Sequence, residues 1–302
     1  FFNSVAFMGK TYTVEEATFD SFKGMDIALF AGGSISKDFA PHAVKAGAVV
    51  IDNSSAFRMD PEVPLVVPEV NPQAILKHKG IIANPNCSTI IMVMALKPIY
   101  DLAKIKRVIV STYQAVSGAG KEGIDELDAQ VREHSEGREM TANILPSASA
   151  EKHYPIAFNL IPQIDVFCDN LYTKEEMKMV NETKKIMEDY EMRITATTIR
   201  VPVYRSHSES VNIELEKEVD LGAMREALAK FPGVTVQDDP SKQEYPMPLY
   251  TSEKDDVYVG RLRRDESCEK SYNMWVVGDQ IRKGAALNTL QIAETMIKNG
   301  WI

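Results

Sequence analysis

One cysteine stands in a sequence context that suits nucleophilic chemistry. Cys87 follows the polar turn Asn84-Pro85-Asn86 and precedes the apolar run 90–96, which predicts a buried helix that begins near the thiol. A thiol at a helix N-terminus faces unpaired backbone N–H groups and the positive end of the helix dipole, so we expect the thiolate to be favoured there. A small buried side chain at a helix start is the alternative. The Asn-rich turn and a later His-Ser-Glu-Ser segment favour a nucleophile.

A histidine with polar neighbours is the candidate partner of this thiol. His207 lies within Tyr204–Ser210, where a strand pattern begins. Imidazole titrates near neutral pH, which suits proton transfer to or from a cysteine nucleophile. The alternative is a surface histidine that caps a strand. Because the two residues are far apart in the chain, their pairing is a hypothesis.

Two arginines, one inside a strand pattern and one at a strand end, are candidates for binding an anion. Arg200 lies inside the β-branched stretch 194–203, where a charge must find a partner or line a cavity. Arg58 comes shortly after the apolar stretch 48–52. A guanidinium binds carboxylate or phosphate through paired N–H groups. A salt bridge to a neighbouring carboxylate is the alternative for each arginine.

Three further groups have side chains or backbone suited to orienting a ligand. Gln114 interrupts an otherwise apolar strand pattern near its end and could orient a carbonyl group, or could be a paired buried amide. The glycine turn 117–120 could present backbone N–H groups to a phosphate or an amide, although a short glycine turn is a weak signal. Glu175 and Lys178 lie one helical turn apart and could present both signs of charge, or form a solvated face.

The first part of the chain predicts a parallel sheet. Strand patterns at 25–31, 48–52 and 80–83 alternate with helical patterns at 36–46 and from Cys87 onward, which is typical of βαβ units. Ligands of such sheets bind beyond the carboxyl ends of the strands. The residues that fall at these ends are Gly32, Gly33, Ser34, Ser54, Ser55, Arg58 and Cys87.

The remainder predicts a mixed sheet with helices. Strands are expected at 107–116, 194–203, 208–216, 234–236, 257–262 and 272–277, helices at 122–133, 173–188, 221–231 and 283–299, and a loop at 134–150. We therefore expect an α/β fold with two domains. Residues 1–86, completed by the C-terminal helix 283–302, would form a doubly wound dinucleotide-binding domain. Residues 87–282 would form an α+β catalytic and dimerisation domain.

Composition restricts the class of function. The chain has 302 residues, 44% of them hydrophobic and 25% charged, with a net charge of −9, which argues against nucleic acid or an anionic membrane as the main partner. Its three cysteines show no CxxC spacing, which favours free thiols in a reducing cytoplasm over a disulfide framework or a metal site. No apolar run approaches the ~20 residues of a membrane span, and no signal peptide is visible. Cys168 and Cys268 are assigned no role.

Taken together, these segments resemble the aspartate-β-semialdehyde dehydrogenase family of the bacterial type. The similarity runs along essentially the whole chain, and its most specific parts are Asn86-Cys87-Ser88-Thr89 and His207-Ser208-Glu209-Ser210. Other matching segments are 32–34, 52–58, 113–120, 200–202 and 283–288. The resemblance implies that NADPH reduces L-aspartyl-4-phosphate to the semialdehyde with release of phosphate, in lysine, methionine and threonine biosynthesis. It also implies a homodimer or a homotetramer.

The resemblance further implies a role for each candidate residue. Cys87 would attack the acyl carbon and form a thioester, His207 would handle protons, and Gln114 would orient the intermediate. The residues expected to hold the phosphate are Arg58, Asn86 and Lys178, and those expected to hold the amino-acid end are Arg200 and Glu175. The residues expected to contact NADP are Gly32, Gly33, Ser54, Ser117, Gly118 and Asn288. Such chemistry is reasonable because phosphate leaves readily and a thioester remains reactive enough to accept hydride.

The sequence departs from the family at its start. The family opens with a strand and a G-x-x-G-x-x-G turn on the cofactor pyrophosphate, and nothing before Met25 supplies them. That strand would be central in the sheet, and its apolar surface contributes roughly 25 cal/mol per Å² buried. We therefore expect the natural protein to have additional N-terminal residues.

Three other functions stay open. An N-acetylglutamyl-phosphate reductase would use the same architecture, but Arg200 and Glu175 suit a free α-amino acid better than an acylated one. A thiol hydrolase or acyltransferase would use Cys87 and His207 without nicotinamide. A non-catalytic relative would lack a complete cofactor site.

Overall fold

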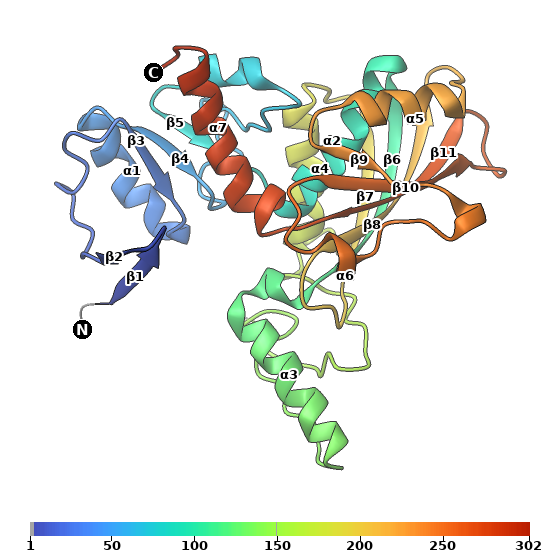
Figure 1. Cartoon of the computed structure of the whole chain (residues 1–302), viewed down its shortest axis with the longest axis horizontal. Coiled ribbons are helices and arrows are strands. Elements are labelled where there is room, and N and C mark those ends of the chain that lie inside the picture. Colours follow the sequence, from blue (N-terminus) through green and yellow to red (C-terminus); the bar gives the residue numbers. More distant parts are fainter. Residues whose placement is uncertain (1–2, 149) are drawn as a thin grey trace.

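The protein contains a small parallel sheet near its N-terminus and a larger mixed sheet, with helices packed on both (Figure 1). The computed structural model describes residues 3–148 and 150–302. In Figure 1 the C-terminal helix α7 runs beside the small sheet, and α3 extends away from the large one. The α/β fold class and its two sheet types are therefore as predicted.

The small sheet is wholly parallel. Its strands are β3 (Ile27–Phe30), β4 (Val49–Asp52) and β5 (Ile81–Ala83), in the order β3-β4-β5, with η1 (Gly33–Ile35), α1 (Ser36–Lys45) and η2 (Pro72–Lys77) in the connections. Phe30 pairs with Asp52, and Asp52 pairs with Ala83, so the carboxyl ends of the three strands meet at one edge. The strands predicted at 25–31, 48–52 and 80–83 are confirmed.

An N-terminal hairpin was not predicted. β1 (Ser4–Phe7) and β2 (Lys10–Thr13) pair antiparallel around Met8 and Gly9, whose φ angles are 48° and 75°. Every residue of both strands is exposed, so the alternation of buried and exposed positions that marks a strand in a sequence is missing. The hairpin forms a separate two-stranded sheet and does not extend the parallel one.

The large sheet has the strand order β7-β6-β8-β11-β10-β9. Its strands are β6 (Ile105–Gln114), β7 (Arg193–Arg200), β8 (His207–Leu215), β9 (Val234–Val236), β10 (Val257–Arg264) and β11 (Ser271–Gly278). β6 and β7 are parallel, as are β9 and β10, whereas β6, β8, β11 and β10 are antiparallel neighbours. The predicted mixed sheet is confirmed, and the first and last residues of its strands differ from the predicted ones by a few positions.

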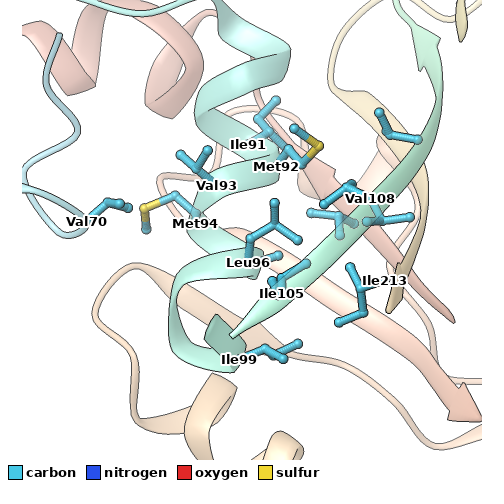
Figure 2. Close-up of a cluster of buried hydrophobic side chains, with 14 of the residues drawn as sticks. Val70, Ile91, Met92, Val93, Met94, Leu96, Ile99, Ile105, Val108 and Ile213 are labelled. Carbon is cyan, nitrogen blue, oxygen red and sulfur yellow. The ribbon is translucent and has the colours of Figure 1, made fainter. Parts of the chain in front are cut away.

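One buried helix, α2 (Cys87–Leu102), forms the centre of the main core. Figure 2 shows its apolar side chains meeting those of β6 and β8, among them Leu96, Ile105, Val108 and Ile213. The helix runs beyond the predicted stretch 90–96 and passes through Pro98. Because Leu96 is fully buried, its truncation to alanine should cost about 2–5 kcal/mol of stability.

The other helices pack around the sheets, except α3, which extends away from the large sheet. They are α3 (Lys121–Ser135), α4 (Lys174–Ile186), α5 (Leu221–Lys230), α6 (Pro248–Thr251) and α7 (Leu287–Lys298), with short turns η3 (Val116–Ala119), η4 (Pro240–Lys242) and a π-helical turn η5 (Arg282–Ala286). From α7, Ile292 and Met296 pack in one cluster with Ile51 and Ile82 of the parallel sheet. Across the described part of the chain, none of the helices has the length and apolarity needed to cross a membrane.

Candidate active site

Three candidate residues meet at one edge of the six-stranded sheet. The last residues of the parallel strands β6 and β7, Gln114 and Arg200, are register partners. β8 runs antiparallel to β6 and begins at this same edge with His207, and the following residue, Ser208, pairs with Tyr113 of β6. Strand direction and register therefore bring together side chains that are far apart in the sequence.

Cys87 lies in the first turn of α2, as predicted. The preceding Asn86 has an extended backbone, with φ −60° and ψ 144°, and its Oδ1 accepts hydrogen bonds from the N–H groups of Ser88 at 3.1 Å and Thr89 at 3.2 Å. This is an N-cap, and it fixes where the helix begins. Gly284 bounds the cysteine on another side, since a Cβ built there would lie 3.0 Å from the Cβ of Cys87.

Glu175 is a buried carboxylate held by two amides. Gln114 Nε2 donates to Glu175 Oε1 at 3.1 Å and to Ser88 Oγ at 2.6 Å. Asn86 Nδ2 donates to the same carboxylate oxygen at 3.0 Å, and Lys178 Nζ pairs with Oε2 at 3.1 Å. Burial opposes ionisation of Glu175, but Lys178 and the two amides outweigh it, so the pKa of the carboxyl lies below its ordinary value. A negative charge therefore persists beside the start of α2.

Arg200 supplies a positive charge beside His207. Its Nη1 donates to the carbonyl of Ala115 at 2.8 Å, while its buried Nε has no partner among residues 3–148 and 150–302. A Cβ at Gly118 would lie 2.6 Å from Nη1 of Arg200 and 3.2 Å from Cε1 of His207. Only glycine can therefore bring its backbone this close to both groups, and Arg200 keeps an unused donor for an anion.

The hydrogen bonds of His207 define its tautomer. The backbone N–H of Ala115 donates to Nδ1 at 3.1 Å, so a neutral ring carries its proton on Nε2. Burial lowers the pKa of His207 well below its ordinary value, and the charge of Arg200 lowers it further. Nε2 is buried and has no hydrogen-bond partner in the part of the chain that the structure describes. His207 therefore offers an N–H donor at Nε2 at neutral pH.

The expected thiolate at Cys87 is contradicted. Burial raises the pKa of the thiol to about 12, and the charge of Glu175 acts in the same direction. Arg58, the N–H of Ser88 and Arg200 lower the pKa, but by less than burial and Glu175 raise it. The helix start is where the sequence predicts it, but desolvation of the thiolate and the charge of Glu175 outweigh the helix dipole. Cys87 is therefore a protonated thiol in the resting protein.

This protonated thiol should react slowly with alkylating reagents. The rise of the pKa from 9.0 to about 12 lowers the thiolate fraction at pH 8 roughly 10³-fold. The higher intrinsic nucleophilicity of such a thiolate offsets part of this, so we expect iodoacetamide to modify Cys87 about 30- to 60-fold more slowly than the exposed Cys268. Peptide mass mapping over time checks the rates. Labelling of Cys87 as fast as that of Cys268 would contradict the raised pKa.

One face of α4 carries three charged groups of the site. Glu175 and Lys178 were predicted. Glu182, which lies one helical turn after Lys178, was missed. Glu182 is buried, and its Oε2 accepts the backbone N–H of Asn86 at 2.6 Å. Burial raises the pKa of Glu182 in spite of the nearby Arg58. The spacing 175, 178, 182 marks one helix face, so the sequence did contain a signal for this residue.

Arg58 and Lys178, two of the residues expected to bind phosphate, form hydrogen bonds and ion pairs with other protein groups in this structure. Arg58 Nε donates to the carbonyl of Asn84 at 2.9 Å, Nη2 donates to the carbonyl of Asn53 at 3.0 Å, and Nη1 lies 3.4 Å from Glu182 Oε1. A guanidinium has five N–H donors, so two stay available. Lys178 Nζ pairs with Asp165 at 3.0 Å as well as with Glu175. Burial disfavours the charge of Lys178, but the two carboxylates outweigh it and raise its pKa.

The residues expected to hold NADP lie at the carboxyl edge of the parallel sheet, in the turn η3 and in the helix α7. Gly32 and Gly33 follow β3 and are exposed, and Gly33 has a φ of +64°. Ser54 follows β4, and its Oγ donates to Asp52 Oδ2 at 2.6 Å. The other carboxylate oxygen of Asp52 is buried and lacks a partner within the described ranges. An open acceptor at the carboxyl edge of a parallel sheet fits a polar ligand there.

The other two places flank the catalytic candidates. Ser117 and Gly118 lie in η3, directly after β6, and Ser117 Oγ accepts a hydrogen bond from Gln280 Nε2. Asn288 is fully buried near the start of α7, and its Nδ2 donates to the carbonyl of Val66 at 3.0 Å and to Asn84 Oδ1 at 2.7 Å. Both amide hydrogens of Asn288 are thus used by protein acceptors, and its Oδ1 retains accepting capacity.

Two family models match the chain. Residues 3–78 match the semialdehyde dehydrogenase NAD-binding domain, and residues 96–283 match the semialdehyde dehydrogenase dimerisation domain. The chain is 57% identical to aspartate-semialdehyde dehydrogenase of Aquifex aeolicus, over 99% of this chain and 87% of that protein. The chain belongs to the aspartate-semialdehyde dehydrogenase family. The resemblance drawn from its motifs is confirmed.

Solved structures agree with this family assignment. The structure of aspartate semialdehyde dehydrogenase II complexed with ASA, from Vibrio cholerae, has a TM-score of 0.92 and 45% identity, over 98% of this chain and 86% of that one. An aspartate semialdehyde dehydrogenase with NADP, from Candida albicans, has a TM-score of 0.69 and 25% identity, over 92% of this chain and 78% of that one. The family fold therefore extends over both sheets of the chain.

Proposed function

We propose that this protein catalyses the NADPH-dependent conversion of L-aspartyl-4-phosphate to L-aspartate 4-semialdehyde and phosphate, and the reverse reaction. Family membership at 57% identity over nearly the whole chain supports the activity. The observation that carries the chemistry is the arrangement of the thiol. Cys87 begins a buried helix and interacts electrostatically with Glu175, Arg58 and Arg200. That set combines a nucleophile with charges suited to an amino acid and a phosphate.

In the proposed first step, Cys87 becomes acylated. Its Sγ forms a bond to the acyl carbon of the substrate, and the bond from that carbon to the phosphate oxygen breaks. Because the thiol is protonated at rest, its proton must leave as the bond forms, and the departing phosphate can carry it away as hydrogen phosphate. Atoms and charge then balance, with a thioester on Cys87 as the product. Gln114, whose Nε2 already bridges Ser88 and Glu175, orients this thioester.

Charged residues would hold the two ends of the substrate. Glu175 would bind the ammonium group and Arg200 the α-carboxylate, because one is a buried carboxylate and the other a buried guanidinium with a spare donor. Arg58, Asn86 and Lys178 would hold the phosphate. For Lys178 this requires sharing its ammonium between the phosphate and two carboxylates.

His207 would stabilise the oxyanion that develops in the thioester reduction. Among residues 3–148 and 150–302 its Nε2–H has no hydrogen-bond partner, and the site around it is buried. The neutral ring keeps this proton and only donates the hydrogen bond. When the bond from the acyl carbon to Cys87 Sγ breaks and the aldehyde leaves, a proton from solvent restores the thiol. With Nδ1 occupied by the N–H of Ala115, the ring acts here as a donor and not as the base that deprotonates Cys87.

The residues proposed to hold NADP are Gly32, Gly33, Ser54, Ser117, Gly118 and Asn288. When bound, NADPH provides the hydride that reduces the thioester carbon. The exposed glycines at the edge of the parallel sheet permit a close approach to the backbone, and Gly118 places bare backbone against His207 and Arg200.

Phosphate-dependent reduction of NADP tests this function. With L-aspartate semialdehyde as substrate, the protein should reduce NADP only when phosphate is present, as followed by absorbance of the reduced nicotinamide. N-acetylglutamate semialdehyde should react far more slowly, because its acetylated nitrogen carries no positive charge for Glu175 to bind. A preference for the acetylated substrate would favour the alternative reductase. Turnover without NADP would favour the thiol hydrolase.

Three wider proposals accompany this function. We propose the domain limits 1–86 with 283–302 for the dinucleotide-binding domain and 87–282 for the catalytic and dimerisation domain. The description of the matching family as a dimerisation domain supports a homodimer or a homotetramer. A cytoplasmic location is supported by the three free cysteines.

A further inference from the structure

Lys283 is a fully buried lysine that no step above uses. Its relative exposure is 0%, and it lies in the π-helical turn η5 that leads into α7. Its Nζ donates to Glu69 Oε2 at 2.5 Å, to Asn288 Oδ1 at 2.9 Å and to Gln291 Oε1 at 2.6 Å. Three acceptors use all three hydrogens of an ammonium group. A buried charge so fully paired is costly to replace and has a defined geometry.

This lysine fixes the orientation of Asn288. An ammonium group has donors only, so the amide of Asn288 must turn its oxygen toward Lys283 and its Nδ2 away. Nδ2 accordingly donates to Asn84 Oδ1 at 2.7 Å and to the carbonyl of Val66 at 3.0 Å. A flipped amide would place N–H groups against the ammonium group and lose all three bonds.

The orientation of Asn288 in turn fixes the amide orientation of Asn84, which contacts Asn53 just after β4. Because Asn84 Oδ1 accepts from Asn288, its Nδ2 is the group that donates to Asn53 Oδ1, at 2.6 Å. The backbone carbonyls of Asn84 and Asn53 then accept from Arg58, at 2.9 and 3.0 Å. Arginine, like lysine, has donors only. A chain of three asparagines therefore connects Lys283 to Arg58, and Lys283 sets the orientation of its side-chain amides.

Lys283 also anchors the turn that bounds the nucleophile. The next residue, Gly284, is buried against Cys87, where an added Cβ would approach to 3.0 Å. π-helical turns are rare and cluster at functional sites. Glu69 comes from the segment before η2, so the ion pair ties this turn to the part of the chain beside the parallel sheet.

We propose that Lys283 is a positioning residue that couples the binding of NADP to the binding of phosphate, through Asn288, Asn84 and Asn53 to Arg58. The inference rests on the proposed function, in which Asn288 contacts NADP and Arg58 contacts phosphate. Phosphate at Arg58 orders the carbonyls of Asn53 and Asn84 and hence the amide of Asn288. The two ligands should then strengthen each other's binding, by the same factor in either order.

Calorimetric titration of NADP with and without inorganic phosphate tests the coupling without turnover. In the wild-type protein, phosphate should tighten NADP binding by about fivefold or more, which is the lower end of typical allosteric coupling. In Lys283→Met, the ratio of the two Kd values should fall to about 1. Lys298→Met is the matched control, because Lys298 is a surface lysine at the end of α7, the helix that follows η5, and pairs with Glu294 at 3.0 Å. Its ratio should equal that of the wild type.

The outcomes separate this proposal from the function on which it rests. A wild-type ratio in folded Lys283→Met, or a ratio of 1 in a wild-type protein that binds NADP, overturns the coupling and leaves the proposed function intact. Failure of the wild-type protein to bind NADP overturns both. If Lys283→Met does not fold, Glu69→Gln removes the ion pair while keeping Lys283. Its ratio should fall toward 1, and an unchanged ratio there overturns the proposal.

A second readout needs no ligand. If Lys283 holds Gly284 against Cys87, its loss should loosen this contact, and iodoacetamide should label Cys87 several-fold faster in Lys283→Met than in Lys298→Met. Equal rates in the two folded variants would overturn the anchoring of the turn. The two measurements together distinguish a positioning role from a general loss of stability, which would raise the labelling of Cys168 as well.

Discussion

Replacement of Cys87 by alanine should abolish phosphate-dependent NADP reduction, lowering kcat by about 10⁴-fold or more. The reason is that no other group in the site can form the thioester. Cys87 alone of the three cysteines begins α2 and interacts with Glu175, Arg58 and Arg200. Removal of one sulfur at a half-buried position should leave the fold intact.

Matched variants make this result specific. Cys168→Ala and Cys268→Ala remove the other two free thiols and should retain wild-type kcat. Single-turnover experiments with labelled substrate should show acylated wild-type protein and no acylation of Cys87→Ala. Retention of activity in Cys87→Ala, with the variant folded by circular dichroism, would remove the cysteine from its assigned role.

Replacement of His207 should lower kcat by about 10²- to 10³-fold, the usual contribution of a hydrogen-bond donor to a developing oxyanion. Two amide substitutions test which ring nitrogen matters. A glutamine amide can place an N–H near the position of Nε2, whereas an asparagine amide reaches only the position of Nδ1, which accepts the N–H of Ala115. If His207 acts as an Nε2–H donor, His207→Gln should retain about tenfold more activity than His207→Asn.

The acid limb of the pH profile provides a second check on His207. The ring is active when neutral, and burial with the charge of Arg200 holds its pKa well below 6.5, so its activity should persist as the pH falls through that value. Loss of activity through His207 is expected only well below pH 6.5. A group with pKa near 6.5 in the wild type that disappears in His207→Gln would contradict the buried neutral ring. His207→Asn matching or exceeding His207→Gln would contradict the donor assignment.

The sequence by itself determined the order of elements and the identity of the family. Local patterns were sufficient for this, because strand and helix periodicity and the turn before Cys87 are read within a few residues. The helix predicted from residue 173 likewise begins there, where Thr173 forms a capping box with Glu176. The exposed hairpin at the N-terminus was missed since it buries neither face.

Only the tertiary structure decided the electrostatics of the site. The pKa of Cys87 depends on packing and on Glu175, Arg58 and Arg200, and their combined effect reversed the expectation from the helix dipole alone. The tautomer of His207 depends on a backbone N–H from another strand. The sequence marked Lys283 only as part of a matching segment. Its burial beside Glu69 could not be predicted, because the two residues are far apart in the chain. Local structure follows from short-range sequence, whereas burial and charge pairing are sums over residues that only the fold brings together.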